Sequence, residues 1–195
     1  MIEVYLFVHP LSQTSYQVEK KLLELIKINN QPINLQILPL VNLSTNTMAL
    51  QQLDPELANN ELHICMSAHS IALDFKAAQL QGKRYARHLL IQLQEALLQQ
   101  RLSYSTELVE QLFSQTGGDL ATFKEDRCSP LVNDLFWKDQ QTAREFNITS
   151  YNAIVIYDFN QDEDGVLFTE DKLLPILDTF EDYLTTPKPS FRLYH

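Results

Sequence analysis

The chain has 195 residues, of which 45% are hydrophobic, so it can bury the core of one domain or of one domain with an insertion. Its formal net charge is −10 and its two cysteines, Cys65 and Cys128, lie far apart, which argues against general nucleic-acid binding, a disulfide scaffold and a zinc cage. We find no signal peptide and no stretch of 18 apolar residues, so we expect a cytoplasmic protein without a membrane span.

The first forty residues predict a parallel βαβ unit. Residues 2–8 are rich in β-branched and aromatic side chains, which is typical of a buried strand, and Pro10 ends that strand. Apolar residues then recur at helical spacing over residues 15–29. Residues 33–40 alternate between apolar and polar and predict a second strand, so a right-handed crossover should join the two.

A long helical block follows. Residues 43–60 are polar and we expect them to be irregular, whereas residues 71–97 have the spacing of one long helix or two abutting ones. Three further helices are predicted from their first residues: Ser105, Asp119 and the Ser129–Pro130 pair. Gly117 should end the first of these three, because glycine accepts the left-handed conformation of a helix C-terminus.

Strand signals return near the end of the chain. Residues 153–157 and 166–168 predict two strands, and the apolar positions of residues 173–183 predict a last helix. Asn160, Asp162 and Asp164 between the strands resemble the start of a calcium loop, but Asp171 stands where a glutamate is usual and strands flank the segment. We therefore favour a polar hairpin turn and an α/β fold in the order βαβ, helices, ββα.

Ser12 and Ser15 lie where the first strand gives way to the first helix. Open α/β sheets carry functional groups beyond the carboxyl ends of their strands, and this spacing is that of a Cys-x-x-Cys motif without its sulfurs. Serine is also among the best helix N-caps, and we favour capping. His9 could act as a base for Ser12, but no third group that would orient it can be named, so we expect a solvated loop histidine.

Three segments give the chain a resemblance to the DsbA family of the thioredoxin superfamily. Residues 6–16, LFVHPLSQTSY, stand where relatives have a strand, Asp-Pro-Leu and Cys-x-x-Cys. Residues 75–85, FKAAQLQGKRY, continue to LQEAL at residues 93–97, where relatives have similar motifs. Residues 143–153, AREFNITSYNA, stand where relatives carry a cis-proline. Within the family, the chain is most similar to cytoplasmic Firmicutes proteins that include the YjbH/SpxH adaptor group.

The resemblance implies a thioredoxin-like domain formed by residues 1–60 and 146–195, with an all-helical domain, residues 61–145, inserted in it. Ser12 and Ser15 replace both cysteines, and a hydroxyl cannot form or resolve a disulfide. Asn152 replaces the cis-proline, and because a cis bond before a residue other than proline is costly, we expect this peptide to be trans. The resemblance therefore implies a former redox site that keeps its shape.

For function, the resemblance to the adaptor group implies a protein that presents a stress-response transcription factor to the ClpXP protease. Its protein partner would bind in a groove beside the former redox site. The predicted groove residues are His9, Leu11, Tyr16, Ser150 and Tyr151.

Two enzymatic alternatives stay open. Kappa-class glutathione transferases and related isomerases share the DsbA-like plan and use a serine at this place, so Ser12 could hydrogen-bond a glutathione thiolate. A DsbA-family oxidoreductase would instead need Cys65 or Cys128, which we expect to be buried in the helical block.

Other clusters give weaker signals. His63, Cys65 and His69 match no closed zinc pattern, so we predict no metal site. Residues 158–182 hold nine acids against one base, which is typical of a solvated face or of a docking surface for a basic partner. Lys83, Arg84 and Arg87 form a small basic cluster, and the sequence does not rank the two surfaces.

Overall fold

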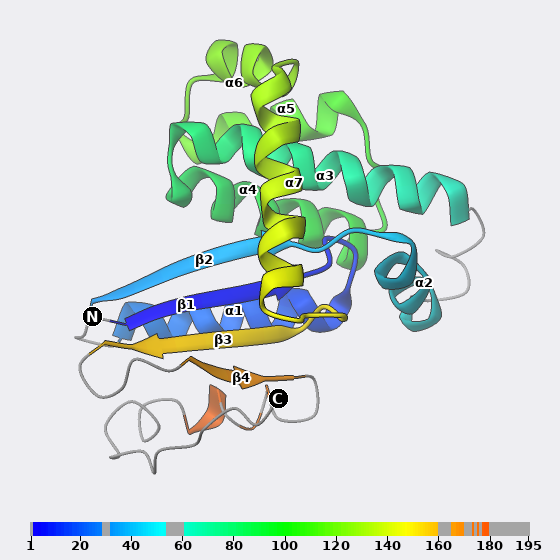
Figure 1. Cartoon of the computed structure of the whole chain (residues 1–195). Helices are drawn as coiled ribbons and strands as arrows, with labels where there is room; N and C mark the ends of the chain where they lie inside the picture. The colour runs from blue at the N-terminus through cyan, green and yellow to red at the C-terminus, as the bar shows by residue number, and fades with distance from the viewer. Residues whose placement is uncertain are drawn as a thin grey trace.

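The computed structural model describes residues 2–28, 32–53, 61–159, 165–169, 173, 175 and 177–179, with backbone alone for residues 61–63. Its sheet has the strand order β2-β1-β3-β4 (Figure 1). The strands are β1 (Ile2–Val8), β2 (Ile33–Pro39), β3 (Ala153–Asp158) and β4 (Val166–Phe168). β1 pairs in parallel with β2 and antiparallel with β3, and β3 pairs antiparallel with β4. The expected thioredoxin-like fold class is confirmed.

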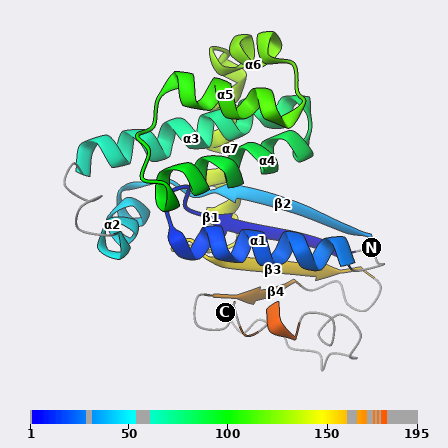
Figure 2. The same cartoon turned by 180° about the vertical axis from the view of Figure 1, so that it is seen from behind.

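Helices make up the rest of the described elements. They are α1 (Gln13–Ile28), α2 (Leu43–Gln52), α3 (Glu61–Gln81), α4 (Lys83–Gln94), the π-helix η1 (Glu95–Gln99), α5 (Thr106–Thr116), α6 (Leu120–Arg127) and α7 (Pro130–Glu145). Helices α3 to α7 gather on one side of the sheet, while α1 runs along a face of it (Figures 1 and 2). Every described element between residues 61 and 145 is therefore helical, as predicted, whereas the domain boundaries stay a prediction.

The predicted helix starts are confirmed by their hydrogen bonds. Ser105, Asp119 and Ser129 each accept a backbone N–H of the first turn that follows, at 3.2, 2.9 and 3.3 Å. Gly117 has φ +85° at the end of α5, which only glycine adopts without strain. Gly82, with φ +142°, separates α3 from α4, so residues 71–97 belong to abutting helices.

One prediction for the first half of the chain is wrong. Residues 43–52, expected to be irregular, form α2. The side chain of Asn42 accepts the N–H of Thr45, and the hydroxyl of Thr45 accepts the N–H of Asn42, at 3.0 and 2.9 Å. This capping box was missed because it has threonine in place of the usual Glu or Gln. Residues 54–60 lie outside the described part of the chain.

The end of the chain is described only in part. Leu173, Pro175, Leu177 and Asp178 are helical, and the other residues of the predicted last helix lie outside the description. The turn at residues 160–164 also lies outside it, so the choice between a calcium loop and a hairpin turn stays a prediction.

Alternating side chains of β1 fill two cores. Ile2, Val4, Leu6 and Val8 belong to one core with α1 and the helical layer, which continues without interruption to Phe113 of α5 and Phe123 of α6. Phe7 belongs to the second core, where Tyr5 packs edge-on against Phe146 just after α7, with ring centroids 5.3 Å apart. The sheet is thus covered on both faces.

Side chains of the helical layer hold the outer edge of β2. Arg87 of α4 donates from Nη2 to the carbonyl oxygen of Leu35 at 2.6 Å, and Gln140 of α7 donates to the carbonyl oxygen of Pro39 at 2.7 Å. A buried ion pair between Lys76 and Asp139 joins α3 to α7. Among the described helices, none has the length and apolar character needed to cross a membrane.

Candidate functional site

The candidate site lies at the carboxyl end of β1. Ser12 is the N-cap of α1, since its Oγ accepts the backbone N–H of Ser15 at 3.2 Å. The N–H of Ser12 donates to the carbonyl oxygen of His9 at 3.0 Å, which closes the tight turn between strand and helix. The capping interpretation is confirmed for Ser12.

Ser15 joins three segments that are distant in sequence. Its hydroxyl donates to Oδ1 of Asn152 at 2.6 Å and accepts the backbone N–H of His9 at 3.1 Å. The N–H of Asn152 in turn donates to the carbonyl oxygen of Phe7 at 2.8 Å. This hydrogen bond joins two side chains 137 residues apart, at the positions where the resemblance to the DsbA family implied a cysteine and a proline.

Asn152 holds an unusual backbone conformation. The described residues contain no cis peptide, so the peptide before Asn152 is trans, as expected, and its φ of +58° lies in the left-handed region that asparagine tolerates better than most residues. Its Nδ2 is buried and has no hydrogen-bond partner within the described part of the chain. An unpaired buried donor costs free energy. The hydrogen bonds of Asn152 to Ser15 and to the carbonyl oxygen of Phe7 oppose this cost and hold the backbone in place.

His9 corrects another expectation. The predicted solvated histidine is fully buried. Its Nδ1 accepts the N–H of Leu11 at 3.2 Å, so Nε2 carries the proton and donates to Oδ1 of Asn46 on α2 at 2.9 Å. Burial lowers the pKa of His9 to about 4, so the ring is neutral at physiological pH. Both ring nitrogens are engaged away from Ser12, so the histidine is not placed as its base.

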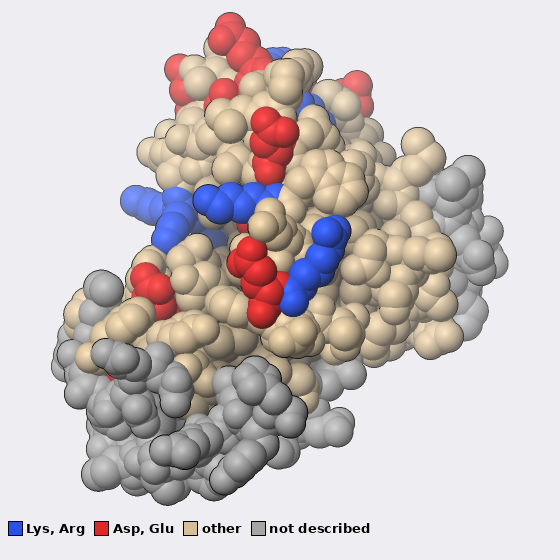
Figure 3. All heavy atoms as spheres, in the orientation of Figure 1, with Lys and Arg blue, Asp and Glu red and all other residues tan. Residues whose placement is uncertain are grey.

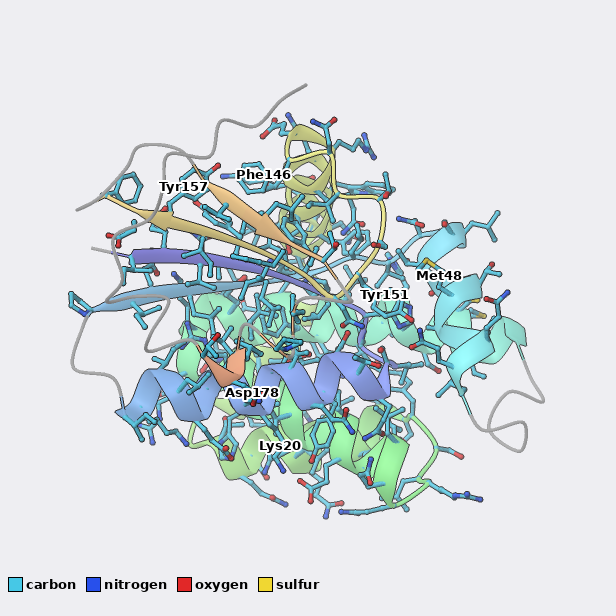
Figure 4. All side chains as sticks on the ribbon, turned by 90° about the horizontal axis from the view of Figure 1, so that it is seen from below. Lys20, Met48, Phe146, Tyr151, Tyr157 and Asp178 are labelled. Atoms are coloured by element: carbon cyan, nitrogen blue, oxygen red, sulfur yellow. The ribbon has the colours of Figure 1, made fainter. Side chains whose placement is uncertain are left out.

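Tyr151 closes the site from the other side. It is fully buried, its hydroxyl donates to Oε1 of Gln52 at 3.1 Å, and its ring centroid lies 5.4 Å from that of His9. Figure 4 shows Tyr151 between the end of the sheet and α2. The helix that the sequence did not predict thus contributes Asn46 and Gln52, which hydrogen-bond to His9 and Tyr151.

The residues predicted to line a partner groove differ in their access to solvent. His9 and Tyr151 are fully buried, Leu11 and Tyr16 are nearly so, and Ser150 is half-buried. Leu11 also borders a cavity of about 240 Å³, whose wall includes Leu53, Ile64, Leu97 and Tyr104. The partner-binding role of the five residues stays a prediction, and Ser150 presents the most surface among them.

A buried carboxyl that the sequence did not single out lies farther along α1. Glu19 is fully buried, and Oε1 accepts the side-chain amide of Gln94 of α4 at 2.8 Å. Oε2 has no partner within the described residues, and burial raises the pKa of Glu19 to about 8. The carboxyl is therefore mostly neutral at pH 7, where α1 meets the helical layer.

The remaining candidates for metal or thiol chemistry are dispersed. Among the described residues, no three His, Cys, Asp or Glu side chains are grouped to hold a metal ion. The ring of His69 packs edge-on against Phe136 at 4.8 Å, and the side chain of His63 lies outside the description. Cys65 is half-buried, but Cys128 is exposed, so its expected burial is wrong; it follows the last residue of α6, at the surface.

A sequence model of the family described as Thioredoxin matches residues 5–178. The chain belongs to the thioredoxin family. This thioredoxin-family chain carries Ser12 and Ser15 at the junction between β1 and α1, and their equivalence to the cysteines of DsbA-like relatives stays a prediction.

Curated relatives point to one group within this family. The chain is 27% identical over 165 residues to the ClpXP adapter protein SpxH of Staphylococcus saprophyticus, which covers 85% of this chain and 59% of that protein. It is 23% identical over 190 residues to the ClpXP adapter protein SpxH of Bacillus cereus, which covers 85% and 62%. The chain thus spans about three fifths of the length of the curated relatives it matches.

Solved structures share the fold over nearly the whole chain. The cytosolic disulfide reductase DsbM from Pseudomonas aeruginosa has a TM-score of 0.68 at 10% identity, covering 93% of this chain and 96% of that one. The oxidoreductase DsbA from Xylella fastidiosa has a TM-score of 0.64 at 14% identity, covering 94% and 83%. At these identities the likeness establishes a DsbA-like fold.

Proposed function

We propose that this protein is a cytoplasmic adaptor that binds a stress regulator and presents it to the ClpXP protease, without thiol–disulfide exchange of its own. The observation that carries the proposal is the buried network at the former redox site. Ser12 and Ser15 are 1% and 0% exposed, and both hydroxyls are engaged in hydrogen bonds within the fold.

The argument against exchange is chemical. A thiolate must reach a substrate disulfide and form a mixed disulfide, and no sulfur is present at the strand–helix junction. Cys65 lies on α3 and Cys128 at the end of α6, and neither takes part in the hydrogen bonds of that junction. A thioredoxin-like fold that keeps its shape without this chemistry remains suited to binding a protein.

The argument for an adaptor comes from the relatives. They are ClpXP adapter proteins, and they match this chain over 85% of its length. The relatives are longer, so the role proposed for this chain concerns the thioredoxin-like part that they share.

The test is a reconstituted degradation assay with purified ClpX, ClpP and the transcription factor that the proposed adaptor would present. We expect the chain to bind the regulator and to accelerate its degradation, and the Cys65→Ser/Cys128→Ser double variant to do so equally well. Absence of both binding and acceleration would refute the adaptor. Loss of function in the double variant would instead favour a role for a thiol.

A further inference from the structure

A groove of about 500 Å³ lies between α1 and α4, away from the former redox site. α1 contributes Leu23, Ile26 and Lys27, and α4 contributes Arg84, Arg87, His88 and Ile91. Figure 2 shows α1 in front of the sheet and α4 above it, in the helical layer along the edge of β2. The groove thus combines apolar and cationic side chains from two rigid elements.

Its floor is apolar and only partly covered. Leu23, Ile26 and Ile91 are half-buried, so each keeps apolar surface that the helical packing leaves in contact with water. Removing such surface from water is favourable by about 25 cal/mol per Å². The floor therefore offers binding free energy to the bulky apolar side chains of a partner.

Its rim is cationic. Lys27, Arg84 and His88 are exposed, and within the described part of the chain neither Lys27 nor Arg84 has an ion pair with an acid. Figure 3 shows basic side chains gathered at one edge, where the helical layer meets the sheet. A chain with 25 acids and 15 Lys and Arg residues therefore concentrates positive charge at this junction.

The neighbouring cations crowd one another. Lys83, which does not line the groove, donates to Oδ1 of Asn34 at 2.7 Å; burial and the charge of Arg87 lower its pKa, while the nearby carboxylate of Glu3 raises it. The electrostatic reason for an acidic ligand therefore comes from the basic residues that do line the groove, Lys27, Arg84 and Arg87.

We propose that the α1–α4 groove is a docking site for an acidic, amphipathic segment of a partner protein. Large apolar side chains of that segment would cover the floor, and its carboxylates would face Lys27, Arg84 and His88. This inference rests on the proposed adaptor function for its biological setting and names the class of segment that such an adaptor would take. The net charge of −10 and the apolar floor favour a peptide over a nucleic acid.

The test uses the full chain and a fluorescent synthetic peptide of Glu and Leu with helical spacing, followed by anisotropy. We expect saturable binding that weakens with added salt, and no binding of the matching Lys and Leu peptide. Arg84→Glu should weaken binding by about tenfold or more, because it reverses a charge at the rim. Arg144→Glu, an equally exposed charge reversal on α7, should leave binding unchanged.

Ile91→Gln tests the floor independently of the rim charge and should also weaken binding. Failure of the acidic peptide to bind, or equal losses in Arg84→Glu and Arg144→Glu, overturns the proposal. The proposal is also overturned if a single-stranded oligonucleotide binds more tightly than the peptide. It is overturned as well if the chain self-associates and Arg84→Glu abolishes that self-association.

The same variants separate this inference from the adaptor function. Peptide binding without accelerated degradation would leave the groove standing and refute the adaptor. If the unsubstituted chain and Arg84→Glu accelerate degradation equally, the adaptor function is supported. The groove is then not the docking site that this function uses.

Discussion

At the junction of β1 and α1, the two serines Ser12 and Ser15 use their hydroxyls differently. Ser12 caps its own helix, a local role that sequence spacing alone predicts. Ser15 bonds to Asn152 and to the backbone of His9, and no local pattern indicates a contact across 137 residues. The capping role of Ser12 was therefore predictable, but the partner of Ser15 was not.

Ser15→Ala should destabilise the fold, because Oδ1 of Asn152 and the N–H of His9 both lose their partner in a buried place. Each buried group left unpaired costs about 1–3 kcal/mol. Urea denaturation measures the loss. Ser114→Ala, which removes an exposed hydroxyl on α5, is the control and should change stability little. Equal midpoints for the two variants would contradict the network.

Glu19 should make stability depend on pH. Its carboxyl ionises near pH 4.5 when unfolded and near pH 8 when folded, so between these values the folded state binds more protons. The free energy of unfolding then falls as pH rises, by up to about 1.4 kcal/mol per pH unit. His9, whose pKa is lowered, gives the opposite slope between about pH 4 and 6.5. Asp139, whose pKa burial raises to about 6, has mostly ionised by pH 6.5. The comparison with Glu19→Gln between pH 6.5 and 8 then assigns the slope to Glu19.

Glu19→Gln should remove this slope and gain stability relative to the unsubstituted chain as pH rises from 6.5 to 8. Glu24→Gln, an exposed change on the same helix, should leave the slope unchanged. Thermal unfolding across the pH series is the measurement, and parallel curves for Glu19→Gln and the unsubstituted chain would contradict a buried neutral carboxyl.

Glutathione should not bind at Ser12. Its hydroxyl is buried and already accepts the amide of Ser15, so a thiolate cannot reach it without opening α1. We expect no saturable heat in calorimetry at millimolar glutathione. Localised amide shifts at Ser12, Ser15 and Tyr151 during the titration would contradict this expectation and favour the glutathione-dependent enzyme.

Among the elements, α2 is the helix that sequence periodicity did not predict. Strands β1 and β2 and the capped starts of α5, α6 and α7 follow from alternation, helical spacing and caps, whereas the spacing of residues 71–97 did not place the break between α3 and α4 at Gly82. α2 buries only Thr45 and Ala49, so it has almost no apolar stripe to read. Missing it led to the wrong expectation for His9, which α2 covers through Asn46.

Asn42→Ala should loosen α2, because it removes one half of the capping box, at a cost of about 0.5–2 kcal/mol. Amides of residues 43–46 should exchange faster with solvent, and the pKa of His9 should rise toward 6.5 as its cover opens. Asn133→Ala, an exposed change inside α7, is the control. Unchanged exchange at α2 and an unchanged His9 pKa would contradict this coupling.

Across the whole molecule, one core crosses the predicted domain boundary. Buried residues of β1 and α1 share a cluster with Phe113 and Phe123, whose rings stack with centroids 3.9 Å apart. The predicted boundary between residues 60 and 61 thus marks a change in the order of elements along the chain. The hydrophobic core continues across it.

The sheet and the helical layer should therefore unfold together. Phe113→Ala should cost about 3–5 kcal/mol. Trp137 fluorescence, which reports α7, and amide exchange of β1 should show the same loss. Leu43→Ala, at an 82% exposed side chain, should shift neither signal. Separate transitions for the two probes would contradict a shared core.

The contacts that Arg87 and Gln140 make with β2 also affect whether another chain can pair with this edge strand. An outer strand with free carbonyl groups is a template on which another chain can extend the sheet, and such templates lead to aggregation. Here the carbonyls of Leu35 and Pro39 are occupied by side chains of α4 and α7. Strand addition is therefore blocked at these two carbonyls, and a partner recognised there must be recognised through side chains.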